Sequence, residues 1–135
     1  MKIMLDEGAK MPTRSHPFDA GLDLYAMKDG IVDYSKTFDT GVHVEIPEGC
    51  VGLIKSKSGL MVNNQITTDG TIDAHYTGSI KVKLFNHGET SYYVEAGQKI
   101  AQLVIIKCEL PELELVDSLE DTDRGSNGFG STGKF

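Results

Sequence analysis

The stretch Ile80–Gly88, which reads IKVKLFNHG, decides the fold class of this 135-residue chain. Ile80, Val82 and Leu84 alternate with lysines, which is the period-two pattern of a strand that buries one face. Asn-His-Gly follows at once and is typical of a turn. The stretch therefore predicts a half-buried strand that ends in a reversal of the chain.

The same pattern recurs on both sides of this stretch. Residues alternate over Val42–Ile46, Val51–Lys55 and Glu112–Leu115, whereas Ile100–Ile106 is a denser apolar run, as for a strand buried on both faces. A sustained period of 3.6 residues is missing, and one short helix is expected near Ser58–Asn63. Short strands separated by turns predict an all-β sandwich or barrel.

The chain carries 20 acidic and 13 basic residues, a net charge of −7, which argues against a nucleic acid polymer or an anionic membrane as partner. Seven of the acids and none of the bases lie in residues 109–123, so the rest of the chain is formally neutral. The acidity therefore belongs to one segment and says little about a binding site elsewhere.

Location and cysteine chemistry can also be predicted. No apolar run approaches the ~18 residues that a membrane helix needs, and the first residues turn acidic too soon for a signal peptide. Cys50 and Cys108 stand alone, without the spacing of a zinc site. We expect free thiols, no membrane association and a cytoplasmic protein.

The last residues, Leu119–Phe135, differ in composition, since glycine recurs four times after Asp123. Such a segment is either a disordered tail or a flexible arm that becomes ordered over a ligand. Gly128–Gly133 matches GxGxxG, and Gly128–Lys134 matches GxxxxGK. Both patterns need a strand before and a helix after, and Phe135 stands where the second needs Ser or Thr, so neither a Rossmann site nor a P-loop is expected.

The chemistry of these residues still suits a nucleotide. A glycine-rich backbone can direct several N–H groups at one anion, and Ser131 and Thr132 add hydroxyl donors. Arg124 offers a planar fork for phosphate, and Phe129 offers a ring on which a base can stack. The segment thus combines phosphate-binding and base-stacking groups.

Five ordered stretches of the chain resemble the five motifs of the trimeric deoxyuridine triphosphatases (dUTPases). They are Ala20–Leu24 (AGLDL), Ser56–Leu60 (SKSGL), Gly70–Gly78 (GTIDAHYTG), Gly97–Leu103 (GQKIAQL) and Arg124–Gly133 (RGSNGFGSTG). The resemblance spans most of the chain, and five motifs in order are far more specific than any one of them.

This resemblance implies a jelly-roll-like β-barrel over residues 1–118, assembled as a homotrimer whose active sites are shared between subunits. Residues 119–135 would form a flexible arm that closes over the site. It also implies hydrolysis of dUTP to dUMP and pyrophosphate with Mg2+, by in-line attack of water on the α-phosphate.

In the third motif, Asp73 matches the general base that activates this water. Without the motif, Asp73 is better explained as a turn residue that bonds its own backbone. Tyr76 resembles the tyrosine whose ring excludes a 2′-hydroxyl, although a core aromatic residue is the alternative. Residues 64–70 would form the hairpin that reads uracil through main-chain groups.

The resemblance assigns the remaining site residues to the phosphates, the base and the metal. The expected substrate-binding residues besides Tyr76 are Lys57, Ser58, Gly59, Gln102, Arg124, Phe129, Gly130, Ser131 and Thr132. Phe129 would stack on uracil, while Gln102 is alternatively a polar strand residue. Asp23 would approach Mg2+ only through a bound water, or would be a strand-edge capping residue; we expect phosphates and water to hold the ion.

Several positions depart from the family pattern. Lys57 replaces a usual arginine and Ser56 a usual proline, so the second-motif contact to phosphate differs in geometry. His75 stands for a common aspartate and is interpreted as a turn residue, with a pH-sensitive contact as the alternative. Thr77 stands for a common arginine, and Gln98-Lys99 for a frequent Asp-Arg pair.

Two rival functions belong to the same fold. The related dCTP deaminases need a glutamate after the third motif, where this chain has Lys83, which cannot serve as that base. A dUTPase-like regulator that binds a protein partner would use nucleotide as its switch, but the sequence has no long insertion between motifs that demands it.

Overall fold

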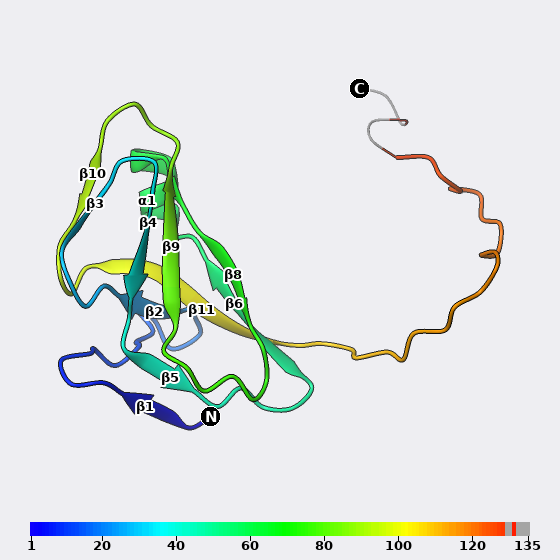
Figure 1. Cartoon of the computed structure of the whole chain (residues 1–135), viewed down its shortest axis with the longest axis horizontal. Coiled ribbons are helices and arrows are strands. Elements are labelled where there is room, and N and C mark those ends of the chain that lie inside the picture. The colour runs from blue at the N-terminus through cyan, green and yellow to red at the C-terminus, as the bar shows by residue number, and fades with distance from the viewer. Residues whose placement is uncertain (129–130, 132–135) are drawn as a thin grey trace.

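The computed structural model describes residues 1–128 and 131. It contains eleven strands and one short helix within that part of the chain. In order, the elements are β1 (Ile3–Leu5), β2 (Leu22–Tyr25), β3 (Gly30–Val32), β4 (Ser35–Asp39), β5 (Val42–Val44), β6 (Cys50–Lys55), α1 (Ser58–Asn64), β7 (Ile66–Thr67), β8 (Asp69–Ile72), β9 (Lys81–Asn86), β10 (Tyr92–Val94) and β11 (Lys99–Lys107). The expected all-β class is therefore confirmed (Figure 1).

The strands form four small antiparallel sheets around one apolar core. The largest has the order β2-β11-β6-β8, another has β4-β9-β7, and the pairs β1-β5 and β10-β3 complete the body. Most neighbours in these sheets are far apart in sequence, which is consistent with a jelly-roll-like fold.

The alternation that predicted β9 is confirmed by its burial. Val82 and Leu84 are fully buried, while Lys81, Lys83 and Phe85 face outward. β11 lies between β2 and β6, and Ile100, Ala101 and Leu103 are fully buried within it. The expected burial on both faces therefore holds for the first half of the run only, because Val104 and Ile105 are partly exposed and Ile106 is 42% exposed.

The strand expected at Glu112–Leu115 does not form in this chain. β11 ends at Lys107, and residues 108–118 contain no helix or strand. Leu113 and Leu115 are 96% and 100% exposed, so the alternating pattern meets neither a partner strand nor a core. Periodicity shows that a segment is suited to a ladder, but a ladder also needs a neighbouring strand to satisfy its backbone groups.

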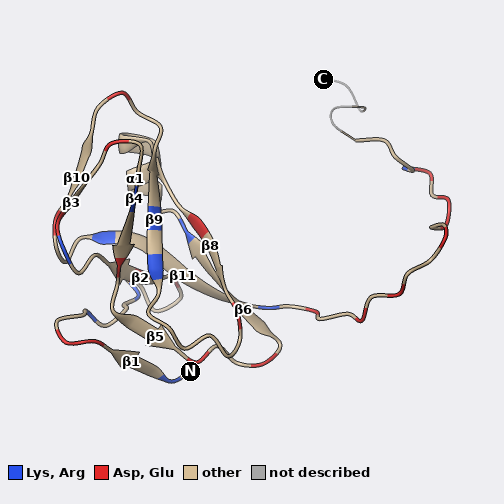
Figure 2. Ribbon diagram, in the orientation of Figure 1, with Lys and Arg blue, Asp and Glu red and all other residues tan. Residues whose placement is uncertain are grey.

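Beyond β11 the chain extends away from the sheets (Figure 1). Figure 2 shows acidic residues, in red, spaced along this extension, in agreement with the acidic segment 109–123. Within the described residues, no helix is long and apolar enough to cross a membrane.

Candidate functional site

Asp23 is the most deeply buried charged residue among those expected in the site, with 3% of its surface exposed. It lies in β2 and accepts contacts from the ammonium groups of Lys57 and Lys99, the latter at 2.7 Å, while the Ser15 hydroxyl donates to it at 3.3 Å. Burial alone would raise the pKa of Asp23, but the two lysine hydrogen bonds outweigh it and lower that pKa. Asp23 thus stays ionised and holds two cations in place, rather than capping a strand edge.

Lys99 and Ser15 in this cluster were not expected as site residues. Lys99 begins β11, and its Nζ also lies 3.3 Å from the Ser15 hydroxyl. The pKa of Lys99 is raised, chiefly by its hydrogen bond to Asp23. The only signal in the sequence was that Lys99 replaces an arginine of the fourth motif, and nothing in it placed that side chain beside Asp23.

Gln102 joins the second and fourth motifs. Its backbone lies between Asp23 of β2 and Lys55 of β6 in the sheet register, and its amide donates to the Ser56 carbonyl at 3.0 Å. A Cβ at Gly21 would come 2.1 Å from the Gln102 side-chain oxygen, so a larger residue there would displace the Gln102 amide from this position. The glycine of the first motif, Gly21, therefore leaves room for the Gln102 side chain.

Ser56 connects the second motif to the hairpin that precedes Asp73. Its hydroxyl donates to the Thr68 carbonyl at 2.8 Å and accepts from the Thr68 amide at 2.9 Å. A proline at this position has no hydroxyl to make these bonds. The departure at Ser56 thus adds two contacts that sequence reasoning did not find.

Ser58 and Gly59 lie in the first turn of α1. Lys57 precedes them in extended backbone (φ −78, ψ 126), without a side-chain cap and with no acidic residue in the first turn. The first N–H groups of a helix have no intrahelical partner and favour an anion. A Cβ at Gly59 would meet no atom within 4 Å, so the chain's own packing does not require glycine there.

Asp73 and Tyr76 belong to a tight turn after β8. The Tyr76 amide donates to the Asp73 carbonyl at 3.2 Å, and the Tyr76 hydroxyl donates to the Ser79 carbonyl at 3.2 Å. The Tyr76 ring is 45% exposed, which is not the burial of a core aromatic residue. A Cβ at Gly78 would lie 2.3 Å from the Tyr76 hydroxyl oxygen, so this glycine is required by the ring position.

His75 lies in the same turn and adopts a left-handed backbone, with φ of 67. Its imidazole is 80% exposed and lies 3.5 Å from the exposed Glu48 carboxylate. Histidine is among the residues that enter this backbone region more readily than most. These facts support its interpretation as a turn residue.

The structure places Asp73 and Gln102 apart within one chain. Gln102 pairs with Lys55 across the β11-β6 ladder, while Asp73 follows Ile72, which pairs with Gly52 on the other side of β6. Four residue steps along β6 and two strand spacings across it give a backbone separation of about 16 Å. The expected residues thus form two groups, one around Asp23, Lys57, Ser58 and Gln102, the other around Asp73 and Tyr76.

The arm residues form local turns only, where they are described. Arg124 Nε donates to the Asn127 carbonyl at 3.3 Å, and the Ser131 amide donates to the Gly128 carbonyl at 3.0 Å. Phe129, Gly130 and Thr132 lie outside the described residues. The structure therefore brings Arg124 and Ser131 to neither group.

The described residues contain no group of three or more His, Cys, Asp or Glu side chains placed to hold a metal ion. Both oxygens of the Asp23 carboxylate already face lysine ammonium groups.

Several known proteins are similar to this chain. The dUTPase family model matches residues 7–133. The deoxyuridine 5'-triphosphate nucleotidohydrolase of Clostridium tetani is 44% identical over 136 residues, which cover 97% of this chain and 94% of that protein.

Two solved structures from phages are also similar. The dUTPase of Staphylococcus bacteriophage 80alpha with bound dUpNHpp has a TM-score of 0.88 and 32% identity, covering 98% of each chain. A variant of the dUTPase from S. aureus phage phi11, described as coordinating a structural Mg(II) ion, has a TM-score of 0.82 and 29% identity over 89% of this chain and 98% of that one.

Proposed function

The chain belongs to the dUTPase family, and from that premise we propose that it hydrolyses dUTP to dUMP and pyrophosphate by in-line attack of water on the α-phosphorus. The observation that carries the proposal is the separation of the site into two groups. One presents cations and N–H donors, which suit a triphosphate, and the other is a turn that carries an exposed carboxylate and a half-exposed tyrosine, which suit attack next to a sugar.

Asp73 acts as general base in this proposal. Its carboxylate takes a proton from a water molecule, whose oxygen forms a bond to the α-phosphorus while the bond from that phosphorus to the bridging oxygen of the β-phosphate breaks. Pyrophosphate leaves with that oxygen. The exposure of Asp73 allows a water to reach it without unfolding the turn.

Tyr76 and the hairpin of residues 64–70 would recognise the nucleoside. The half-exposed Tyr76 ring, held by Gly78 and the Ser79 carbonyl, gives a flat surface against which a deoxyribose can lie without room for a 2′-hydroxyl. β8 is an edge strand of its sheet, so its free backbone groups are available to pair with uracil.

The phosphates would be bound by the second group and by the arm. Ser58 and Gly59 offer donors at the start of α1, with Gln102 beside them, and Asp23 orients Lys57 toward the same region. From the arm, Arg124, Ser131 and Thr132 would bind the outer phosphates, while Phe129 and Gly130 would cover the uracil. Residues 119–135 would form the closing arm, and residues 1–118 would form the body.

Mg2+ fits this donor set as an ion held by the substrate. The described residues offer no carboxylate cluster, and a triphosphate with water supplies the hard oxygen ligands that this ion prefers. When bound, Mg2+ neutralises charge on the phosphates as the bond to the leaving group breaks. Asp23 would approach it only through a water molecule.

A homotrimer with shared active sites accounts for the separation of the two groups. Because Asp73 and Gln102 lie about 16 Å apart in one chain, a site that uses both at one phosphate would draw them from different subunits. The exposed leucines of residues 110–119 have no cover in a single chain and would gain it from a neighbouring subunit.

The two cysteines bear on where the protein works. Free Cys50 and Cys108 support a cytoplasmic location.

Pyrophosphate release measured with dUTP, dTTP, dCTP and UTP tests the proposed activity. We expect hydrolysis of dUTP alone at an appreciable rate, dependence on added Mg2+, and loss of turnover in Asp73→Asn with retained dUTP binding. Glu48→Gln is the matched control, because it removes an exposed carboxylate that lines the same hollow as Asp73. Equal hydrolysis of the four nucleotides, or full turnover in Asp73→Asn, would refute the proposal.

A further inference from the structure

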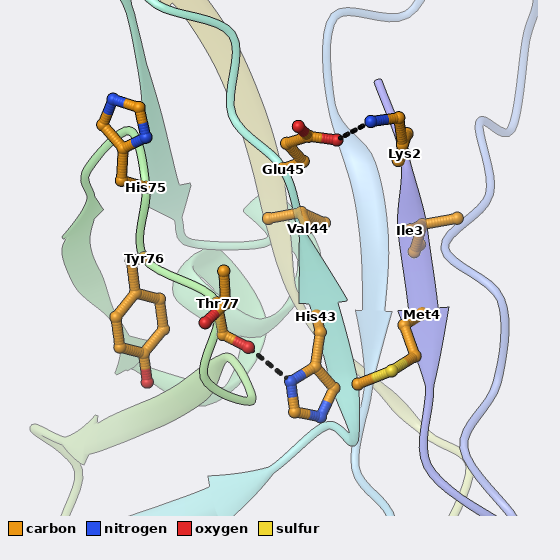
Figure 3. A pocket seen from close by; sticks show the side chains of 9 residues that line it. All are labelled: Lys2, Ile3, Met4, His43, Val44, Glu45, His75, Tyr76 and Thr77. Carbon is orange, nitrogen blue, oxygen red and sulfur yellow. Dashed lines mark hydrogen bonds and ion pairs between the residues drawn. The ribbon is translucent and has the colours of Figure 1, made fainter.

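His43 makes two polar contacts on the body side of the turn that carries Tyr76. It lies in β5 opposite Met4 of β1, and its imidazole is 17% exposed. Nδ1 lies 2.7 Å from the Thr77 carbonyl oxygen, and Nε2 lies 3.2 Å from the Asp6 carboxylate. Figure 3 shows the ring pointing from β5 to Thr77, with Tyr76 next along the turn.

The two partners decide the protonation of this ring. A carbonyl oxygen and an ionised carboxylate accept hydrogen bonds and donate none, so both contacts are made only if both ring nitrogens carry a proton. His43 is therefore an imidazolium in this arrangement. In agreement, the Thr77 hydrogen bond raises the pKa of His43 the most, partial burial opposes it, and Asp6 raises it further.

We propose that His43 is a positioning residue of the nucleoside side of the site, which clamps the Thr77 carbonyl and so fixes the turn that presents Tyr76 and Asp73. The inference rests on the proposed function for its effect on dUTP, but the clamp itself is a property of the free protein. Thr77 lies between Tyr76 and Gly78, the glycine that the ring position requires. A shift of this carbonyl would therefore move the ring that faces the sugar.

Other charged and titratable groups surround the clamp. They are Lys2 just before β1, Asp6 just after it, Asp39 at the end of β4, Glu45 just after β5, and His75 and Tyr76 in the turn. Lys2 and Glu45 pair with each other at 2.9 Å, and Asp39 also acts to keep His43 charged. The local balance favours the imidazolium.

The clamp is expected to weaken as pH rises. A histidine whose pKa is raised in the folded protein holds its contacts below the ordinary value of 6.5 and loses them as pH rises through the raised value. The neutral ring has one N–H, so it keeps the bond to Thr77 or the bond to Asp6, but not both. His43 then has one partner instead of two, and the Thr77 carbonyl has no donor from His43 in the fraction of molecules whose single ring N–H bonds to Asp6.

The test compares His43→Ala and His43→Gln with the control Glu45→Gln, all in the full chain. Glu45 follows β5 and lines the same hollow as His43, so Glu45→Gln removes a nearby titratable group, the partner of Lys2, and leaves the His43–Thr77 contact in place. The first readout is independent of activity: hydrogen exchange of the Tyr76 and Gly78 amides, together with an NMR titration of the His43 ring. The second is the KM and kcat for dUTP, and the ratio of dUTP to UTP hydrolysis, between pH 6 and pH 9.

We expect the His43 ring of the wild type to titrate above 6.5 and amide exchange in the turn to quicken across that titration. His43→Ala should show fast exchange at every pH and a KM raised about three- to tenfold with a smaller change in kcat. His43→Gln keeps one donor for Thr77, so its KM should lie between those of the wild type and His43→Ala. That KM should not change with pH, because glutamine does not titrate.

Two results would overturn the inference. One is turn exchange in His43→Ala that matches Glu45→Gln at all pH values, and the other is a His43 ring that titrates at or below 6.5. If the exchange changes as expected but no variant or wild type hydrolyses dUTP, the proposed function fails while the clamp stands. If dUTP is hydrolysed but His43→Ala has an unchanged KM, the clamp does not position the site.

Discussion

Asp23→Asn is the substitution whose effect on stability can be estimated most closely from the structure. It keeps the size of the side chain and removes the charge that holds Lys57 and Lys99. Breaking a fully buried ion pair by neutralising one partner costs about 3–5 kcal/mol. Because the two lysine side chains are 27% and 42% exposed, water replaces part of the lost interaction, and we expect a loss of about 2 kcal/mol.

Thermal unfolding followed by circular dichroism provides the assay. For a chain of this size, each kcal/mol lost from the free energy of unfolding lowers the melting temperature by about 3 °C. Asp23→Asn should therefore melt about 6 °C below the wild type at pH 7. Asp69→Asn is the matched control, since its pair with Lys55 at 2.6 Å is exposed on both sides. That pair should be worth at most about 1 kcal/mol. Protein concentration must be equal throughout, because an oligomer melts in a concentration-dependent way.

The stabilisation that Asp23 provides depends on pH. The pKa of Asp23 is lowered from 3.8 in the folded protein, so its contribution is complete above 3.8 and is lost as pH falls through the lowered value. The gap between wild type and Asp23→Asn should therefore close in acid. Equal melting of Asp23→Asn and Asp69→Asn at pH 7, or a gap that persists in strong acid, would refute the reasoning.

Three further predictions concern the arm and the turn. Ending the chain after Asp123 should leave a folded trimer by analytical ultracentrifugation with little dUTPase activity; an unfolded product would show the arm to be structural. Tyr76→Ala should raise UTP hydrolysis relative to dUTP about tenfold or more, whereas Tyr34→Ala, at an 88% exposed position, should leave the ratio unchanged. Gly78→Ala should displace the Tyr76 ring and lower the free energy of unfolding by about 1–3 kcal/mol; wild-type melting and KM would contradict the packing argument.

Much of the fold could be predicted because its longer strands bury one or both faces. The pattern at Lys81–Asn86 follows directly from burial, and the helix at Ser58–Asn64 is confirmed. In Cys50–Lys55 a strand forms where expected, but Gly52 and Ile54 are buried and Val51 and Leu53 are only partly buried. Strands of two to four residues, such as Ile66–Thr67, are too short to show a period. Their existence depends on partners distant in sequence, which local pattern cannot reveal.

The sequence predicted which residues belong to the candidate site better than it predicted where they lie relative to one another. The motifs named Asp23, Lys57 and Gln102, which the structure brings together, and also Asp73, which it places apart. No local signal showed that Asp23 would hold two lysines, because that depends on burial and on the register of β2 against β11. Sequence reasoning also missed His43, since a single histidine in a strand has no motif around it.

We propose that a complete active site combines Asp73 of one chain with Gln102 of another. If both residues act in the site, Asp73→Asn and Gln102→Ala should each lose most of the dUTPase activity alone, and joint refolding of the two variants then tests the sharing. If sites are shared, random assembly leaves both residues intact in about a quarter of the sites, so the mixture should regain about a quarter of the wild-type dUTPase activity. If each chain contains its own site, the mixture will stay as inactive as the two variants alone, and the account will be wrong.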